Sequence, residues 1–441
     1  MRRMILLAAC TLLPGCAVQR AAQVATTFAS HVLCDDVLVT GTDLPTAFAE
    51  RVLAQPGMAL VAWGLTPEVD TAAREVRVSV AGAVAAHARQ IEGLGCVALP
   101  ADQPLPAGPP GRPPAAAQPP GAADPRLAPV LADALASPGH FTKAVVVLQH
   151  GRLLAEAYAP GYGPDTPVLG FSMTKTLTNL LAGRLVALGR LRLDEPVRGD
   201  LTGAHLLRQT SGLDLPQDNS GFDHSTQVMY GVADKAAAIA AAPRESAPGT
   251  RWAYADTNFM LLAQVLQRHA GEPLATFAQR ELFAPIGITS ARFDHDASGV
   301  PVGSSHALAS ARDWARLGQL LLDDGIAGGR RLLPEGWVAW STTPTLDTGY
   351  GAGLWTNRKP GLVPGWGVPW GLASAPADAF FARGYMGQFT VVMPSDGLVM
   401  VRLAVSPVRG DDIGETDRVL RAVRAAVSAP PPSPPVRPAG A

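Results

Sequence analysis

Residues 171–189 read FSMTKTLTNLLAGRLVALG. Leucines recur at the spacing of one helix face, which predicts a helix with a buried side. Gly189 predicts the end of this helix, because glycine readily takes the left-handed conformation that closes helices. Ser172 and Lys175 stand three residues apart in the first turn, so their Cβ atoms lie about 5–6 Å apart on one face. Unpaired N–H groups and the positive end of the helix dipole favour developing negative charge at this turn.

This pair of residues has a chemical reading and a structural one. A serine hydroxyl needs a base before it becomes a useful nucleophile. We expect partial burial at the helix start to lower the pKa of Lys175, so that it accepts a proton or stabilises a neighbouring phenolate. The structural reading is a helix-capping serine followed by an exposed lysine. Spacing alone favours the structural reading, because S-x-x-K arises often by chance.

A second motif begins with Pro-Gly-Thr at residues 248–250 and leads to Tyr254. A phenol with an ordinary pKa of about 10 is mostly neutral at pH 7. A nearby lysine ammonium favours the phenolate, which is the physical reason for placing serine, lysine and tyrosine together. A phenol beside a lysine can therefore move protons, and a buried core aromatic is the competing reading of Tyr254.

Strand patterns stand at both ends of the region 126–428, and helical patterns fill its middle. Two hairpins are predicted, the first with a His-Gly turn and the second with an Asp-Gly turn, over residues 143–149 with 152–158 and over 389–393 with 398–404. A final helix is predicted from the spacing of apolar residues between 416 and 427. This order indicates an α+β fold with an antiparallel sheet and an inserted helical region.

Taken together, these motifs resemble the β-lactamase and penicillin-binding-protein superfamily. The resemblance is carried by S-x-x-K at Ser172, by the following G-R-L-R-L-D-E-P-V, by H-L-L-R-Q-T-S-G-L at 205–213 and by the Y-x-N-like element at Tyr254. Further stretches resemble the 6-aminohexanoate-dimer-hydrolase-like branch, namely 303–306, 309–318, 333–338 and 350–355. The resemblance covers about residues 126–428. It implies a β-lactamase/transpeptidase-like fold with Ser172 as nucleophile and Lys175 and Tyr254 as its activating partners.

The third family element corresponds to residues 381–388, before the strand that begins at Phe389. The resemblance implies an oxyanion hole made by the backbone N–H groups of Ser172 and Gln388. Gly387 lets a substrate approach the backbone closely. Tyr385 stands where relatives carry lysine or histidine, so recognition of a substrate carboxylate is weakened. Tyr385 is predicted to hydrogen-bond the substrate or to pack along the rim of the site.

Two more residues are candidates for substrate binding. Asp256 stands where class C β-lactamases have asparagine, and a carboxylate only accepts hydrogen bonds, which argues against binding the usual β-lactam amide. It is either a helix cap or a site residue that pairs with Lys175. His306 is either a cleft residue near the substrate or a hydrogen-bonded structural histidine. No zinc-binding spacing of His and Cys occurs, so no metal and no cofactor are predicted.

The N-terminus reads as a bacterial lipoprotein signal. Two arginines precede a short apolar run, and Leu13-Pro14-Gly15-Cys16 resembles a lipobox, although Pro14 is unusual there. The prediction is a signal peptide at 1–16, lipidation of Cys16 and a place on the periplasmic face of the outer membrane, with an ordinary cleaved signal as the alternative. Cys34 and Cys96 are predicted to form a disulfide, and two isolated thiols are the alternative.

The remaining organisation follows from composition. We predict a small α+β domain at 17–100, a Pro/Ala-rich linker at 101–125, the hydrolase domain at 126–428 and a Pro-rich tail at 429–441. The formal net charge of -1 gives no indication of nucleic-acid binding.

The predicted activity is hydrolysis of a small ester or linear amide through an acyl-enzyme. A D,D-peptidase or β-lactamase is the enzymatic alternative. A catalytically weak periplasmic ligand-binding protein is the alternative of another class.

Overall fold

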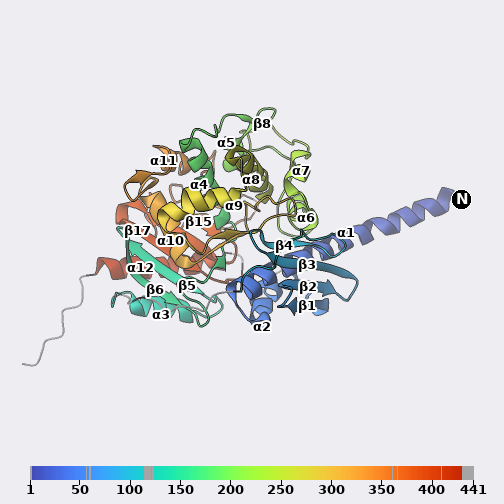
Figure 1. The fold of residues 1–441 in the computed structure, drawn as a ribbon, viewed down its shortest axis with the longest axis horizontal. Coiled ribbons are helices and arrows are strands. Elements are labelled where there is room, and N and C mark those ends of the chain that lie inside the picture. Colours follow the sequence, from blue (N-terminus) through green and yellow to red (C-terminus); the bar gives the residue numbers. More distant parts are fainter. Residues whose placement is uncertain are drawn as a thin grey trace, which may run out of the picture.

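The computed structural model describes residues 2–55, 57–58, 61–113, 121, 124–359, 361–364, 366–408 and 410–429. Within residues 2–16 it describes the backbone only, so the predicted lipidation at Cys16 falls on a side chain outside the described part. Figure 1 shows a mixed body of helices and strands, with helix α1 projecting from one side. The two largest antiparallel sheets, of six and four strands, lie in different parts of this body.

The larger sheet has six antiparallel strands in the order β14-β15-β16-β17-β5-β6. Its strands are β5 (Ala144–Gln149), β6 (Arg152–Tyr158), β14 (Trp355–Thr356), β15 (Phe380–Gly384), β16 (Gln388–Met393) and β17 (Leu398–Leu403). Both predicted hairpins are therefore confirmed, as β5–β6 and β16–β17. Gly397 adopts the positive φ of 57° that its turn requires. Strands from the two ends of the region pair through β17 and β5, which brings distant sequence into one sheet.

Helices cover both faces of this sheet (Figure 1). One face packs against α3 (Ala128–Ala136) and α12 (Asp411–Ser428) through a cluster that includes Leu131, Val147 and Leu420. The other face packs against α4 (Met173–Ala187) and α10 (Ala311–Leu322) through a cluster that includes Leu177, Trp314 and Val401. Alternation along each strand sends successive side chains to these two clusters.

A helical region lies between the two halves of the sheet in sequence, beside α4. Its helices are α5 (Gly203–Leu207), α6 (His224–Gly231), α7 (Lys235–Ala240), α8 (Asp256–Ala270), α9 (Leu274–Ala278) and α11 (Trp337–Ser341), with η5 (Gln279–Phe283) and η6 (Ala284–Ile286) after α9. Short strands connect it to the rest: β7 (Val168–Leu169), β8 (Pro196–Arg198), β9 (Leu201–Thr202), β10 (Arg292–Phe293), β11 (Ala307–Ala309), β12 (Ile326–Ala327) and β13 (Arg330–Arg331). The predicted α+β fold with an inserted helical region is confirmed.

The described residues before 100 form a second sheet with helices packed on it. We call residues 17–100 the N-terminal module. Its helical segments are α1 (Arg2–Leu33), η1 (Cys34–Thr40), α2 (Leu44–Ala47), η2 (Phe48–Leu53) and η4 (Ala62–Gly64). Its strands are β1 (Leu65–Asp70), β2 (Glu75–Val80), β3 (Val84–Ile91) and β4 (Gly95–Pro100), which pair as an antiparallel meander. Helix α1 packs across β2, β3 and β4.

A disulfide joins Cys34, directly after α1, to Cys96 in β4. Beyond β4 the chain runs back along β3, where Gly111 N–H donates to the Gln90 carbonyl at 2.8 Å. Residues 114–120, 122–123 and 430–441 belong to the predicted linker and tail and lie outside the described part. Among the described helices, none combines the length and apolar character that crossing a membrane requires.

Candidate functional site

Ser172 lies at the start of α4, at the floor of a cavity of about 640 Å³. The chain arrives there through Gly170, where a Cβ would collide with the Trp314 ring, and Phe171, which has a positive φ of 45°. A non-glycine residue held in the left-handed region is strained, and such strain is typical of functional turns. Ser172 makes no capping hydrogen bond with its side chain, which disfavours the helix-cap reading. Its Oγ instead accepts from Lys175 Nζ at 3.1 Å.

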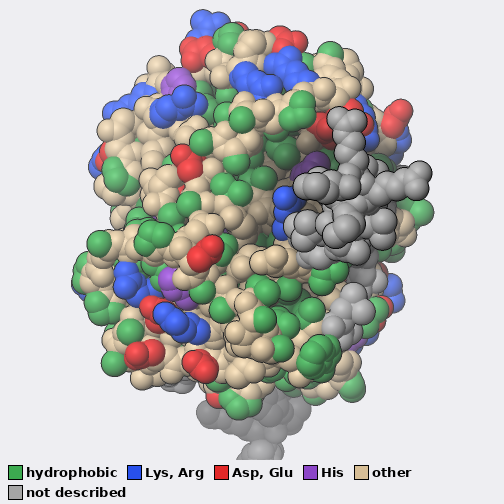
Figure 2. Space-filling model, turned by 90° about the vertical axis from the view of Figure 1, so that its right-hand side faces the viewer, with side chains coloured by type: hydrophobic (Ala, Val, Ile, Leu, Met, Phe, Trp, Pro, Cys, Tyr) green, Lys and Arg blue, Asp and Glu red, His purple; other side chains and the backbone are tan. Residues whose placement is uncertain are grey.

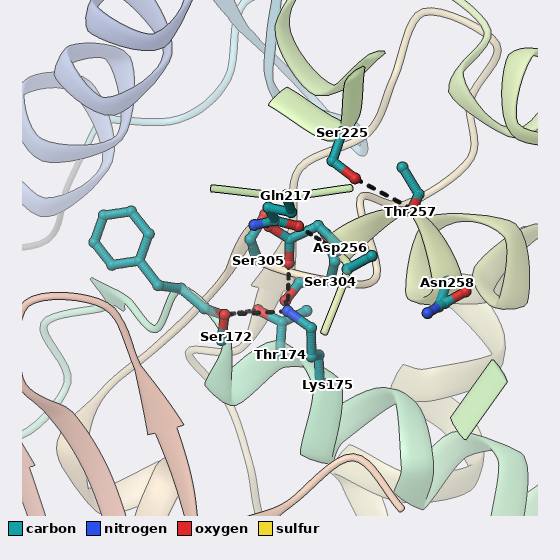
Figure 3. A network of polar contacts seen from close by, with 12 residues as sticks. Ser172, Thr174, Lys175, Gln217, Ser225, Asp256, Thr257, Asn258, Ser304 and Ser305 are labelled. Carbon is teal, nitrogen blue, oxygen red and sulfur yellow. Dashed lines mark hydrogen bonds and ion pairs between the residues drawn. The ribbon is translucent and has the colours of Figure 1, made fainter. Parts of the chain in front are cut away.

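Lys175 is almost fully buried, and its ammonium contacts several groups at once (Figure 3). Nζ donates to the Ser304 carbonyl at 2.9 Å and forms an ion pair with the Asp256 carboxylate. Nζ also lies 4.7 Å from the centre of the Tyr254 ring. The structure therefore brings Ser172, Lys175 and Tyr254 together, as the sequence predicted.

The charge state of Lys175 differs from the expectation. Burial opposes the ammonium, but attraction to Asp256 and Tyr254, together with hydrogen bonds to both, outweighs it and raises the pKa of Lys175 above its usual 10.5. The expected lowering was wrong because the sequence does not show that Asp256 lies against this amine. The raised pKa favours the charged ammonium form of Lys175 at neutral pH.

Tyr254 comes just before α8 and is half-buried at the cavity wall. Its ring stacks on Trp355 at 6.1 Å between centroids and meets Trp366 edge-on at 5.1 Å. These aromatic rings fix the orientation of the phenol while one side stays open to the cavity. Tyr254 therefore packs against aromatic rings and also lines the cavity.

Asp256 is the first residue of α8, and Ala255 occupies the capping position. Its carboxylate contacts Lys175 on one side and accepts from Gln217 Nε2 at 2.7 Å on the other, while Gln217 Oε1 accepts the Asp256 N–H at 2.6 Å. Asp256 therefore belongs to the site network drawn in Figure 3. Gln217, which fixes this carboxylate, was missed, because a glutamine in a loop gives no signal in the sequence.

The hairpin β15–β16 forms another wall of the cavity. Gly384 and Tyr385 line the cavity with Ser172, and a Cβ at Gly384 would collide with the Gly170 carbonyl. Gly387 has a φ of 98° and turns the chain between the strands. Gln388 is fully buried, does not line the cavity, and has its side chain bonded to the Tyr385 and Ala404 carbonyls. The structure thus places Tyr385, rather than Gln388, beside Ser172.

His306 lies behind the cavity wall instead of in it. Its ring stacks on His31 of the N-terminal module at 4.0 Å between centroids, and its Nδ1 hydrogen-bonds Ser305 Oγ at 2.6 Å. Burial, reinforced by the nearby positive charges of His31, Lys235 and Lys175, lowers the pKa of His306 well below its usual 6.5. The position corrects the substrate-binding assignment and agrees with the structural reading of this residue.

His31, Asp35 and His306 are near enough to one another to be considered as metal ligands, with ligand atoms within 4.8 Å. The two imidazole planes lie only 15° apart in a stack, so their in-plane lone pairs run side by side and do not converge on one point. Burial and the adjacent Asp294 carboxylate raise the pKa of Asp35 well above its usual 3.8, which favours its neutral form. This cluster is suited to joining two parts of the chain.

The N-terminal module reaches the cavity, which the sequence did not reveal. Gln55 lines the cavity, accepts a hydrogen bond from the Tyr385 hydroxyl and donates to Met386 Sδ at 2.9 Å. The Arg51 guanidinium lies over the Phe171 ring at 5.6 Å. The N-terminal module therefore contacts Phe171, the residue before Ser172, and also Tyr385 and Met386 in the hairpin β15–β16.

Comparison with known proteins agrees with this architecture. A family model described as "Beta-lactamase" matches residues 127–424. A 6-aminohexanoate-dimer hydrolase from Paenarthrobacter ureafaciens is 27% identical over 229 residues, which are 45% of this chain and 56% of that protein. Esterase EstB from Burkholderia gladioli is 29% identical over 181 residues, or 34% of this chain and 46% of that protein. The chain thus spans about half the length of these curated relatives.

Among solved structures, a penicillin-binding protein homolog from Caulobacter crescentus superimposes with a TM-score of 0.54 at 18% identity. The superposition covers 70% of this chain and 100% of that one. At this identity the likeness describes the fold alone. The N-terminal module lies before the first residue of the family match.

Proposed function

Because the chain belongs to the beta-lactamase family, we propose that it is a serine hydrolase that cleaves an ester or a linear amide through an acyl-enzyme on Ser172. The observation that carries this proposal is the approach of Lys175 Nζ to Ser172 Oγ, at 3.1 Å, on the floor of a cavity that Tyr254 also lines. Hydrolases among the relatives, an esterase and an amide-cleaving enzyme by name, support the same reaction class.

Tyr254 is the base in this mechanism. Ser172 Oγ attacks the substrate carbonyl carbon while its proton passes to the Tyr254 phenolate oxygen. Lys175 stays an ammonium because its pKa is raised, so it stabilises the Tyr254 phenolate before the attack. After the attack, Tyr254 gives its new proton to the leaving group. A water molecule then attacks the acyl carbon and gives its proton to Tyr254, which passes it to Ser172 Oγ as that oxygen leaves. This step releases the acid and restores the enzyme.

The negative oxygen of the tetrahedral intermediate needs donors that are already in place. The N–H of Ser172 points from the first turn of α4, where the helix dipole adds positive potential. The N–H of Tyr385, at the end of β15 and on the cavity wall, replaces that of Gln388 as the second donor in our proposal. Such a donor is worth about 2.7–4 kcal/mol of transition-state stabilisation.

The charges around the cavity favour a substrate without a carboxylate. Among the described lining residues, Arg383 alone is a lysine or arginine, and it is paired with Asp412 at 3.1 Å. The Asp256 carboxylate, also in the lining, is paired with the Lys175 ammonium, so this pair adds no free positive charge to the cavity. β-Lactams and cell-wall stem peptides present a carboxylate, so they find no free cation here. An ester or linear amide without that group fits better than the substrates of a D,D-peptidase or β-lactamase.

We further propose that the protein is exported and anchored by a lipid on Cys16 at the periplasmic face of the outer membrane. The support is the sequence alone, in which basic residues and a short apolar run precede Leu13-Pro14-Gly15-Cys16. Radiolabelled palmitate incorporation, lost in Cys16→Ser, tests this address. Unchanged incorporation in Cys16→Ser would contradict it.

Exposure to a fluorophosphonate followed by intact-mass measurement and peptide mapping tests the reaction class. We expect one adduct on Ser172 in the wild type and none in Ser172→Ala. Ser305→Ala is the matched control, because Ser305 also lines the cavity and should leave the adduct unchanged. A folded wild type that forms no adduct would favour the ligand-binding alternative instead.

A further inference from the structure

We call residues 126–428 the hydrolase part of the chain. The cavity that Ser172 lines has one wall that does not come from this part. Helix α1 and the segment after η2 supply this wall, and we call it the module wall. Its residues in the cavity lining include Ala22, Val24, Ala25, Phe28, Met58 and Val61. All six residues are apolar. The four that belong to α1 recur at the spacing of one helix face.

The lining from the rest of the chain is apolar as well. It includes Phe171, Met229, Tyr230 and Met386, and the Tyr230 ring meets Phe28 of the module wall edge-on at 5.6 Å. The polar residues of the lining include Ser172 and Asp256, which hydrogen bonds join to Lys175 and Gln217. A site that combines such a polar group with a largely apolar lining is complementary to a molecule with one polar reacting group and an extended apolar substituent.

The module wall is held firmly in place. Asp36 pairs with Arg51 at 2.8 Å inside the module, and Glu50 pairs with Lys143 of the hydrolase part at 2.6 Å. His31 of α1 hydrogen-bonds Asp294 at 3.0 Å across the same boundary. Because the module wall is already ordered before the substrate binds, little conformational entropy is lost on binding. Burial of an apolar substrate group against the wall therefore contributes to affinity.

The mouth of the cavity is also apolar. Four exposed hydrophobic side chains belong to the cavity lining: Val18 at 63%, Phe222 at 53%, Val408 at 57% and Tyr385 at 38% exposed. Figure 2 shows the side of the molecule from which α1 projects, with hydrophobic side chains spread between patches of charge. An apolar chain longer than the cavity can therefore continue along the rim.

We propose that the substrate is an ester or amide that carries an extended apolar chain, and that the module wall binds this chain. The inference rests on the proposed hydrolase function and narrows it to one substrate class. The chain belongs either to the acyl group or to the leaving group. An apolar chain on either group would make the same contacts with the module wall. The experiment below distinguishes the two.

The test compares kcat/KM over two series. One series is p-nitrophenyl esters from acetate to decanoate, and the other is acetate esters of alcohols from butanol to decanol. We expect kcat/KM to rise about two- to fourfold for each added methylene in one of the series, which also identifies the side that binds the wall. Flat profiles in both series, with measurable turnover of the acetate, would overturn the inference.

A substitution that fills the cavity links the effect to the wall. Ala22→Phe adds bulk from α1 into the cavity, and we expect it to lower the octanoate-to-acetate ratio of kcat/KM by at least about tenfold. Arg20→Phe is the matched control, since Arg20 is exposed on the same helix and outside the cavity lining. An equal change of the ratio in both variants would contradict a role for the wall.

A binding measurement separates failure of this inference from failure of the proposed reaction. Ser172→Ala protein is titrated with 1-octanol and 1-butanol by calorimetry. We expect octanol to bind at least about tenfold more tightly, and Ala22→Phe to remove the difference. Octanol preference without a fluorophosphonate adduct would mean that the wall binds chains in a protein that is not a hydrolase. An adduct on Ser172 without octanol preference would mean a hydrolase whose wall does not select chains.

Discussion

Lys175 and Asp256 form the most heavily buried charge pair of the cavity, with side chains 1% and 9% exposed. A buried ion pair costs much of its solvation and is retained where its geometry serves another purpose. Here the pair keeps Lys175 positive beside Tyr254, because attraction to Asp256 outweighs burial. In the proposed mechanism Asp256 is therefore a positioning residue, and we expect it to set the pH range over which the ammonium persists.

Asp256→Asn tests this role through pH. With the carboxylate charge removed, burial of Lys175 is opposed less strongly, so its pKa falls. The wild-type ammonium is lost only as the pH rises through a pKa above 10.5, and in Asp256→Asn it is lost at lower pH. We therefore expect the alkaline limb of the kcat/KM profile to move to lower pH. Identical alkaline limbs, with far-UV circular dichroism showing intact folds, would contradict the assignment.

At the scale of elements, α1 is fixed to the sheet of the N-terminal module at its C-terminal end. The disulfide joins Cys34 to Cys96 across a sequence separation of 62, and both residues are buried in the module core. The same core includes Leu169, Phe171 and Met386 from the hydrolase part. Packing of α1 therefore determines the position of the module wall and of the residue before Ser172.

Replacement of both cysteines by serine tests this connection. The closed loop predicts a loss of about 4 kcal/mol in the free energy of unfolding, as an upper figure from chain entropy. Urea unfolding of the wild type, of Cys34→Ser/Cys96→Ser and of wild type kept in reductant measures it. The reduced wild type should match the double variant. Unfolding curves that coincide in all three samples would show that the bond contributes nothing.

At the scale of the whole molecule, the hydrolase part and the N-terminal module share a buried polar contact. The Asp294 carboxylate accepts from His31 Nε2 at 3.0 Å and from the Cys96 N–H at 2.7 Å, and it is fully buried. Both donors come from the module, and the acceptor comes from the segment after β10. Such a contact requires one arrangement of the two parts, because any other leaves these groups without partners.

Asp294→Ala removes the shared acceptor. Two buried donors are then left unsatisfied, and we expect a loss of about 3 kcal/mol in unfolding free energy. Asp43→Ala is the matched control, because this exposed aspartate only caps α2 and should cost about 1 kcal/mol. Thermal and urea unfolding of both variants gives the comparison. A smaller loss for Asp294→Ala than for Asp43→Ala would contradict a tight junction between the two parts.

The sequence by itself determined much of the hydrolase part. Hairpins β5–β6 and β16–β17 and helix α4 follow from local signals, namely alternation, Gly turns and helical periodicity, which act over a few residues. The order of the motifs was sufficient to identify Ser172, Lys175 and Tyr254 as candidates. The fold class follows from the same order of strands and helices.

Only the tertiary structure decided what surrounds these residues. The charge of Lys175 and the ion pair of Asp256 depend on side chains that meet across many residues of sequence, and only the folded chain shows that Tyr385 lines the cavity with Ser172. The sequence leaves both readings of His306 open, because it does not show that the His31 ring stacks on it. The module wall is the largest such case, since apolar residues of α1 read as ordinary core until the cavity beside them is seen. Burial and electrostatics depend on distance in space, and sequence records only distance along the chain.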